Sequence, residues 1–253
     1  MFSEKTTIMI QARTGSTRLP GKVLKKIEKK PMIWHVINRV KRIKSVQQIA
    51  LITTKEKSDK VLLKVAKENG IIGFVGETLD VLDRHYKCAK EINANPIIRI
   101  TSDCPLVDPK LVEEMLQFYL KNNYDYVTNT IIPTYPDGLD TEIFSFTALK
   151  KAAKEATKSY DREHVTPFFA SHPDKFKIYN YQNENDLSDL RWTVDRAQDL
   201  KFVRKIYSQM RPKRVFYMNE TIRLLKKEPK LLEINKGIMR NEGSKQLKKS
   251  SVD

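Results

Sequence analysis

The first 130 residues alternate between short apolar runs typical of β-strands and longer amphipathic runs typical of helices. Residues that favour helix ends, such as Pro31, Asp108 and Gly70, lie at several of the junctions. We expect strands at 6–11, 48–53, 71–75, 96–100 and 124–130, and helices at 31–43, 58–69, 78–92 and 108–121. This alternation predicts an α/β fold, in which a mostly parallel central sheet carries helices on both faces.

The loops that follow the strands are the expected place for function, because ligands of such sheets bind at the carboxyl ends of the strands. These loops are residues 11–22, 53–57, 76–80 and 101–108. The second half of the chain is less regular, with expected strands at 139–146, 175–181 and 191–194 and helices at 147–158, 197–210 and 219–227. We expect one domain over residues 1–238 and a polar, disordered tail over 239–253.

Composition excludes several classes of protein. No apolar run approaches the roughly 20 residues that a membrane span needs, and the first residues lack the pattern of a secretion signal. We therefore expect a cytoplasmic protein without a membrane span. The two cysteines, Cys88 and Cys104, have no metal-binding or redox spacing, and we expect both to be free buried thiols.

The net charge of +16 is unevenly distributed. Residues 1–44 hold 12 Lys and Arg against 2 acidic residues, and residues 211–253 hold 12 against 5, so the middle of the chain is close to neutral. Basic ends are compatible with nucleic-acid binding or with solvated lysines that keep a protein soluble. Since the charge is split and no nucleic-acid-binding motif is present, we expect no nucleic-acid partner.

The loop after the first expected strand has the sequence QARTGSTRLPGK. It combines two glycines and three small hydroxyl residues with the cations Arg13, Arg18 and Lys22. A triphosphate needs backbone N–H groups that approach closely and cations that neutralise its oxygens. The glycine spacing fits neither a Walker A loop nor a GxGxxG dinucleotide loop. Its composition favours phosphate binding, with an ordinary flexible basic loop as the alternative.

Two aspartates follow expected strands: Asp103 in TSDCP and Asp195 in WTVDR. Two carboxylates at the same edge of a sheet can hold one Mg²⁺, which takes few protein carboxylates together with phosphate oxygens and water. The alternative for each is a turn or helix-cap aspartate. None of the four histidines is spaced for zinc.

Six segments, in order along the chain, resemble the sugar cytidylyltransferases. The first is the basic loop with its flanks, IQARTGSTRLPGKVL. The others are VGETLDVLDRHYKCA at 75–89, RITSDCPLVDP at 99–109, PDGLDTEIFS at 136–145, DREHVTPFF at 161–169 and RWTVDRAQDL at 191–200. The set most resembles the spore coat polysaccharide biosynthesis protein F family, whose relatives make CMP-activated 3-deoxy-manno-octulosonate and CMP-acylneuraminates.

The resemblance implies a Rossmann-like, nucleotide-diphosphosugar-transferase fold and a set of nucleotide-binding residues. It implies that Arg13, Arg18 and Lys22 surround the triphosphate and serve catalysis. The other implied nucleotide-binding residues are Gln11, Ala12, Gly15, Ser16, Asp80 and Arg84, the last two near the base. It also assigns Asp103 and Asp195 to Mg²⁺.

The acceptor side of the site is less defined. The resemblance points to Glu142, Arg162, Glu163 and His164, with Arg162 facing a sugar carboxylate or phosphate and His164 a hydroxyl. The alternatives are a salt-bridge cluster at the start of a helix for residues 161–166 and a sheet-edge cap for Glu142.

The implied activity is that of a nucleotidyltransferase. We expect a Mg²⁺-dependent enzyme that moves CMP from CTP onto a sugar or sugar acid and releases pyrophosphate, for polysaccharide or glycoconjugate synthesis. Use of another nucleoside triphosphate, or of a sugar-phosphate acceptor, is the alternative within the same fold. The resemblance alone also implies a homodimer.

Overall fold

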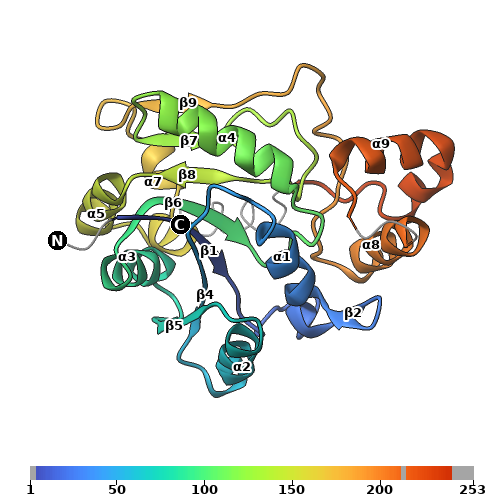
Figure 1. Cartoon of the computed structure of the whole chain (residues 1–253), viewed down its shortest axis with the longest axis horizontal. Helices are drawn as coiled ribbons and strands as arrows, with labels where there is room; N and C mark the ends of the chain where they lie inside the picture. The colour runs from blue at the N-terminus through green and yellow to red at the C-terminus, as the bar shows by residue number, and fades with distance from the viewer. Residues whose placement is uncertain (1–3, 212–214, 241–253) are drawn as a thin grey trace, which may run out of the picture.

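The structure is a computed structural model and describes residues 4–211 and 215–240. At its centre is a seven-stranded sheet with the strand order β5-β4-β1-β6-β8-β7-β9 (Figure 1). The strands are β1 (Lys5–Gln11), β4 (Gln48–Thr54), β5 (Ile72–Gly76), β6 (Ala94–Thr101), β7 (Tyr126–Thr128), β8 (Glu142–Phe144) and β9 (Ile178–Asn180). A separate hairpin consists of β2 (Lys26–Ile27) and β3 (Lys30–Pro31).

Four consecutive strands of the sheet, β5, β4, β1 and β6, run parallel. β8 is antiparallel to both of its neighbours, β6 and β7, whereas β7 and β9 are parallel. The predicted α/β class with a mostly parallel sheet is therefore confirmed. Because parallel strands point the same way, the loops after β1, β4, β5 and β6 all leave from one edge of the sheet.

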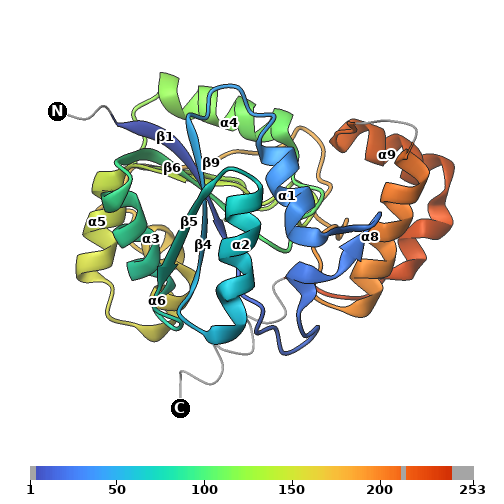
Figure 2. The ribbon, with the colours of Figure 1, turned by 60° about the horizontal axis from the view of Figure 1, so that its bottom comes forward.

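Helices cover both faces of the sheet (Figures 1 and 2). One face carries α1 (Met32–Val40), α2 (Lys60–Glu68) and α4 (Pro109–Lys121). The other carries α3 (Val81–Glu91), α5 (Phe146–Glu155), α6 (Ser159–His164) and α7 (Pro167–Ala170). α8 (Ala197–Met210) and α9 (Met218–Lys227) lie together at one end, beyond α1. Three short 3₁₀ turns are η1 (Lys22–Leu24), η2 (Lys57–Asp59) and η3 (Pro229–Ile234).

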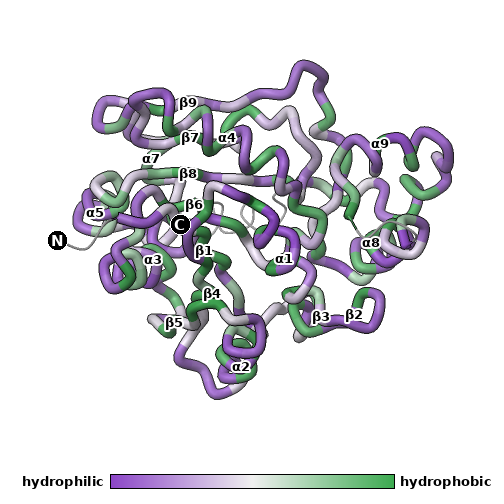
Figure 3. The backbone as a smooth tube through the Cα atoms, in the orientation of Figure 1, coloured by the Kyte–Doolittle hydropathy of each residue, from purple (hydrophilic) through white to green (hydrophobic). Residues whose placement is uncertain are grey.

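The central strand β1 shows how the sheet separates two hydrophobic cores. Ile8 and Ile10 pack into the cluster beneath α1 and α4, whereas Met9 packs into the cluster beneath α3 and α5. Successive side chains of a strand point to opposite faces, and all three are fully buried. Each contributes about 1.5–3 kcal/mol of hydrophobic free energy relative to an exposed position. Figure 3 shows the result as hydrophobic central strands and hydrophilic outer helix turns.

The segment 191–194, predicted as a strand, is not one. Only Arg191 forms an isolated bridge, with Asp137, and the next three N–H groups bond to carbonyls of loop residues. Trp192 and Thr193 donate to the carbonyl of Asp137, and Val194 donates to that of Asp103 at 2.8 Å. Trp192, Thr193 and Val194 are residue types that favour strands, but the backbone of the segment is paired with loops at the edge of the sheet.

Other sequence expectations fare differently. The helices α6 and α7 were not predicted, and Cys88 and Cys104 are free and buried as expected. The expected tail lies outside the described residues except for Met239 and Arg240, so the domain boundary at 238 stays a prediction. Within the described residues, no helix has the length and apolar character needed to cross a membrane.

Candidate active site

Lys22, Asp103 and Asp195 meet at the carboxyl edge of the sheet. The ammonium of Lys22 donates to Asp103 Oδ2 at 2.8 Å and to Asp195 Oδ1 at 2.8 Å. It also donates to the carbonyl of Val194 at 3.0 Å. Arg18 adds a second cation, with its guanidinium 2.9 Å from Asp195 Oδ1. Residues 173 positions apart in the chain thus form one cluster of opposite charges.

The parallel pairing of β1 with β6 explains half of this convergence. Gln11, the last residue of β1, lies opposite Thr101, the last residue of β6. The two loops that follow must therefore leave side by side, and the N–H of Ser102 bonds to the carbonyl of Gln11. Lys22 comes from the first loop and Asp103 from the second.

The charges of this cluster stabilise one another. Burial disfavours the ammonium of Lys22, but the negative charges of Asp103 and Asp195 outweigh it and raise the pKa of Lys22 above its usual value. Burial also disfavours the Asp103 carboxylate, yet Lys22 and the hydroxyl of Thr101 lower the pKa of Asp103 to about 2. At neutral pH the contact is therefore fully ionic.

A glycine sets the position of Lys22. Gly21 has φ +64°, a left-handed conformation that costs other L-residues about 1–2 kcal/mol and glycine little. Its N–H bonds to the carbonyl of Thr14, and its carbonyl accepts from Leu24 at 2.9 Å. The chain thus turns sharply into η1, whose first residue is Lys22.

Asp59 fixes the other end of the basic loop. It is 1% exposed and accepts hydrogen bonds from the N–H of Thr14 at 2.7 Å and from the Thr14 hydroxyl at 2.6 Å. The hydroxyl of Thr54, at the end of β4, donates to its second oxygen. Burial opposes its ionisation, but these hydrogen bonds outweigh burial and lower the pKa of Asp59. Asp59 thereby ties the basic loop to the neighbouring strand.

The remaining residues of the loop are held by their backbone or face outward. The N–H of Ala12 donates to the carbonyl of Ile52 at 3.0 Å, and that of Ser16 to the carbonyl of Thr14 at 2.9 Å. Gly15 is exposed, and a Cβ built there would meet nothing within 4 Å. The loop therefore presents open backbone beside Arg13 and Arg18, which are both exposed.

Asp195 is oriented by a buried ion-pair network. Arg191, whose side chain is 6% exposed, donates to Asp195 Oδ2 at 3.1 Å, to Asp137 at 2.8 Å and to Asp199 at 3.0 Å. Asp199, 0% exposed, also accepts from the N–H groups of Asp195 at 3.0 Å and Arg196 at 2.9 Å. The loop carrying Asp195 is thus fixed from both sides.

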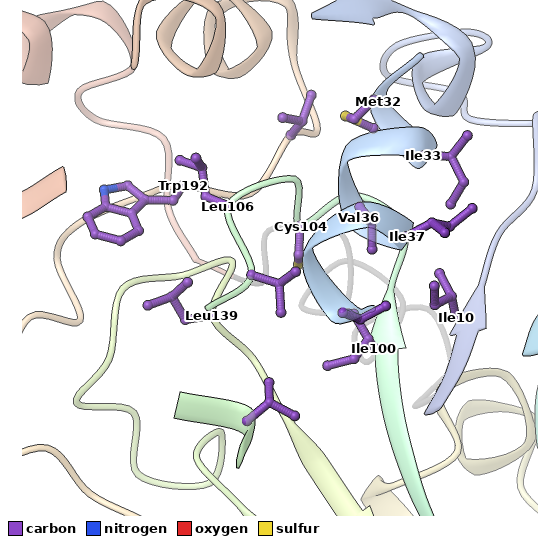
Figure 4. Close-up of a cluster of buried hydrophobic side chains, with 14 of the residues drawn as sticks. Ile10, Met32, Ile33, Val36, Ile37, Ile100, Cys104, Leu106, Leu139 and Trp192 are labelled. Carbon is purple, nitrogen blue, oxygen red and sulfur yellow. The ribbon is translucent and has the colours of Figure 1, made fainter. Parts of the chain in front are cut away.

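Close backbone contact secures the same segment. At Gly138, with φ +108°, a Cβ would lie 2.5 Å from the N of Thr193 and 2.7 Å from the carbonyl carbon of Trp192. Only glycine fits there without moving backbone. Figure 4 shows Trp192 and Leu139 on one side of the hydrophobic cluster and Val36 of α1 on the other.

The C-terminal described residues close one side of the site. Asn235 donates to the carbonyl of Arg191 at 2.9 Å and to Asp199 at 3.1 Å. Arg240 forms an ion pair with Asp140 and donates to the carbonyl of Tyr135 at 3.1 Å. Burial raises the pKa of Asp140, which the positive charge of Arg240 opposes.

Arg84 and His164 lie close enough to Arg13 to feel its charge. Burial and the positive charge of Arg13 lower the pKa of Arg84 to about 10, and burial together with the charges of Arg99 and Arg13 lowers that of His164. His164 is therefore neutral at pH 7, and its Nε2 is buried with no hydrogen-bond partner among the described residues. Val165, the next residue, has φ +72°, and this strain of about 1–3 kcal/mol in a β-branched residue is typical of functional sites.

Three other residues assigned to the nucleotide or acceptor already have protein partners. Arg84 donates to the carbonyls of Glu77 and Thr78, and Asp80 caps α3 by accepting from the N–H of Asp83 at 2.9 Å. Arg162 pairs with Asp80 at 2.6 Å and donates to two backbone carbonyls of α5 and its end. Arg162 thus forms a salt bridge, but it lies in the second half of α6 and its partner Asp80 is outside residues 161–166, so the contact is not the helix-start cluster of the alternative.

Glu142 and Gln11 share a partner. Arg99 of β6 forms an ion pair with Glu142 and donates to Oε1 of Gln11 at 3.0 Å. Glu142, 6% exposed, also accepts from the hydroxyl of Tyr126 at 2.9 Å. Glu163 is half-buried in α6 beside His164.

The donor set at Lys22 suits a small divalent cation. Asp103 and Asp195 direct one oxygen each at a common point. Across residues 4–211 and 215–240, no three or more histidine, cysteine, aspartate or glutamate side chains are grouped to hold a metal ion. Two carboxylate oxygens that point at one position fit an ion such as Mg²⁺, which completes its shell with phosphate oxygens and water.

Sequence reasoning missed Asp59, Arg191 and Asp199. Each acts by orienting another residue of the site. Arg191 and Asp199 flank Asp195 in the segment RWTVDRAQDL, so the resemblance of this segment could have pointed to them. Asp59 lies two residues beyond the loop expected after the second strand, residues 53–57.

The mostly parallel sheet, with a basic loop and paired carboxylates at its carboxyl edge, defines the class of nucleotidyltransferases. The chain belongs to the cytidylyltransferase family, whose model matches residues 7–240. The predicted family, fold and enzyme class are thereby confirmed.

Individual relatives cover nearly the whole chain. An uncharacterized protein of Methanocaldococcus jannaschii is 36% identical over 91% of this chain and 94% of its own length. The spore coat polysaccharide biosynthesis protein SpsF of Bacillus subtilis is 28% identical over 87% of this chain and 94% of its own. A cytidylyltransferase structure from Leptospira borgpetersenii is 33% identical with a TM-score of 0.88, and the match covers 94% of this chain and 100% of that one.

Proposed function

We propose that this cytidylyltransferase moves CMP from CTP onto a hydroxyl of a sugar or sugar acid, releases pyrophosphate and depends on Mg²⁺. Polysaccharide or glycoconjugate synthesis is the proposed purpose, supported by the likeness to SpsF. The observation that carries the proposal is the convergence of Lys22, Asp103 and Asp195 beside the exposed cations of the basic loop. A cytoplasmic location and a homodimer are part of the proposal; the first rests on the sequence, and the second rests on the family resemblance alone.

The basic loop is the proposed triphosphate site. Arg13 and Arg18 are exposed on it, and the open space at Gly15 lets phosphate oxygens approach backbone N–H groups. Gln11, Ala12 and Ser16 complete the proposed nucleotide contacts on this side. The cations neutralise the charge that develops on the leaving pyrophosphate, so positioning and electrostatics supply most of the catalysis.

Asp103 and Asp195 are the proposed ligands of Mg²⁺. When bound, the ion neutralises phosphate charge and lowers the pKa of a hydroxyl that it contacts. Arg191 and Asp199 hold Asp195 in place for this task, and Thr101 does the same for Asp103, donating at 2.5 Å.

His164 is the strongest candidate on the acceptor side. Its ring has a buried Nε2 without a hydrogen-bond partner among the described residues, and an unpaired buried polar atom costs free energy that an acceptor hydroxyl would recover. Glu142, Arg162 and Glu163 stay in the proposed acceptor site as residues that shape it. Asp80 and Arg84 stay in the proposal as residues near the base. They would act indirectly, by holding the loop between β5 and α3.

The test is pyrophosphate release with each of four nucleoside triphosphates and a panel of acceptors. The panel contains 3-deoxy-manno-octulosonate, an acylneuraminate, neutral sugars and sugar phosphates. We expect release with CTP and a free sugar or sugar acid. Turnover only with another nucleoside triphosphate, or only with sugar-phosphate acceptors, would contradict the proposal. It would favour the alternative activity within the same fold.

Two substitutions test the assignment of residues. Lys22→Ala and Asp103→Asn should each lower turnover by at least about a hundredfold, because each removes a group that acts on the phosphates. Circular dichroism and thermal unfolding serve to confirm that both variants fold. Lys26→Ala, at an exposed position four residues away, is the matched control and should keep full activity. Wild-type rates in either test variant would remove that residue from the mechanism.

A further inference from the structure

The ammonium of Lys22 occupies the point on which the two carboxylates converge. It lies 2.8 Å from an oxygen of Asp103, 2.8 Å from an oxygen of Asp195 and 3.0 Å from the carbonyl of Val194. Its side chain is 12% exposed, so little water shares these contacts. Three protein oxygens therefore already surround one positive charge.

The outer oxygens of the two aspartates have other partners. Oδ1 of Asp103 accepts from the hydroxyl of Thr101, and Oδ2 of Asp195 accepts from Arg191. The oxygens that face one another, Oδ2 of Asp103 and Oδ1 of Asp195, are the two that Lys22 contacts. A cation that bridges the aspartates from within must take these same oxygens.

We propose that Lys22 and the divalent cation are alternative occupants of one site between Asp103 and Asp195, and that a bound triphosphate opens this site by drawing the ammonium away. The inference rests on the proposed function, since it takes the nucleotide to be the ligand of the basic loop. It makes Lys22 responsible for the order in which the site fills.

Lysine suits this exchange because its ammonium is a point charge on a flexible stem. A triphosphate bound beside Gly15 and Arg18 offers it phosphate oxygens in place of the carboxylates. Asp103 then loses its cation, and Asp195 keeps only its contacts with Arg18 and Arg191. The uncompensated negative charge favours entry of a divalent ion. By linkage, nucleotide and divalent cation strengthen one another's binding by the same factor.

The first experiment measures Mn²⁺ binding to the full-length protein without nucleotide, from the loss of the free-ion signal in electron paramagnetic resonance. We expect weak binding to the wild type and at least about tenfold tighter binding to Lys22→Met, within the usual range for coupled sites. Lys26→Met removes the same charge at an exposed position and should bind as the wild type does. Adding Asp103→Asn to Lys22→Met should reverse the gain.

The second experiment needs no Lys22 variant and stays decisive if Lys22→Met does not fold. Asp103→Asn should leave Mn²⁺ binding unchanged without nucleotide and weaken it about tenfold with α,β-methylene-CTP, in the same range for coupled sites. Two results would overturn the proposal. The first is tight Mn²⁺ binding to the wild type without nucleotide that Asp103→Asn weakens. The second is a folded Lys22→Met protein that binds Mn²⁺ no more tightly than the wild type. Absence of pyrophosphate release with CTP would instead contradict the proposed function and leave the nucleotide-free titration intact.

Discussion

At the scale of single residues, the site depends on side chains that orient others. Asp59 is the clearest case, because its two oxygens accept from Thr14 and Thr54 and so join the basic loop to β4. A carboxylate can accept from all of these donors at once, whereas an amide of the same shape offers one accepting oxygen.

We therefore predict that Asp59→Asn raises the KM for CTP roughly tenfold, corresponding to about 1.4 kcal/mol for the lost hydrogen bonds. Turnover at saturating CTP should fall less, since the phosphate-binding residues themselves remain. Steady-state kinetics with varied CTP measure both. Glu56→Gln, the same chemical change at an exposed position on the same loop, should leave the KM unchanged. An unaltered KM in Asp59→Asn would show that the loop does not need this anchor.

The sequence predicts some contacts of the site better than others. Lys22 and Asp103 were both expected at the carboxyl edge of the sheet, and the observed pairing of β1 with β6 brings them into contact. The partners of Arg84 and Arg162 include backbone carbonyls, which any residue type supplies and which leave no mark in the sequence. For this reason, the sequence could not show which arginines of the family-like segments bind a ligand and which stabilise the fold.

At the scale of elements, the start of α8 determines the position of Asp195. Asp199, in its first turn, accepts from the N–H groups of Asp195 and Arg196 and pairs with Arg191. A buried charge that loses its partner is costly, by about 3–5 kcal/mol.

Asp199→Asn should lower the free energy of unfolding by about 1.5–3 kcal/mol, because Arg191 loses one of its three carboxylate partners. Turnover should also fall, since an amide has a single accepting oxygen for Arg191 and for the N–H groups of Asp195 and Arg196, so the loop that carries Asp195 is held less firmly. Urea unfolding followed by circular dichroism measures the first effect, and pyrophosphate release the second. Asp189→Asn, at an exposed position just before the same segment, should match the wild type in both. A variant as stable as the wild type would mean that Arg191 finds compensation elsewhere.

Long periodic elements were predictable, and short ones were not. α4 and α8 carry apolar residues at helical spacing over 13 and 14 residues, and both were found where expected. α6 and α7 have 6 and 4 residues, which is too short for a periodic pattern. Val165, with a positive φ, lies between them. The segment 191–194 is buried and holds residue types that favour strands, yet its backbone pairs with loops, so residue type alone does not reveal strand pairing.

At the scale of the whole molecule, a buried histidine links stability to pH. His85 of α3 is 0% exposed, and its Nδ1 bonds to the carbonyl of Val81 at 2.8 Å. Burial, aided by the positive charge of Arg99, lowers the pKa of His85 from 6.5 to about 3. The unfolded chain therefore takes up a proton at a higher pH than the folded protein does, so stability falls as the pH drops below 6.5.

We predict that the wild type loses about 2 kcal/mol of unfolding free energy between pH 8 and pH 5 through this residue. His85→Gln should lack that component, because an amide does not titrate. Urea unfolding of both proteins at the two pH values measures the difference. Curves that shift in parallel would show that His85 does not contribute to acid sensitivity.

The separation of Lys22 from Asp195 by 173 positions has a consequence for synthesis on the ribosome. A nascent chain carries the basic loop and Asp103 long before the second carboxylate has been polymerised. Asn235, which bonds to Asp199, follows later still. A fragment that ends before Asp195 can thus present its cations to phosphate but lacks half of the acidic pair, so at least the first 195 residues must be synthesised before catalysis is possible.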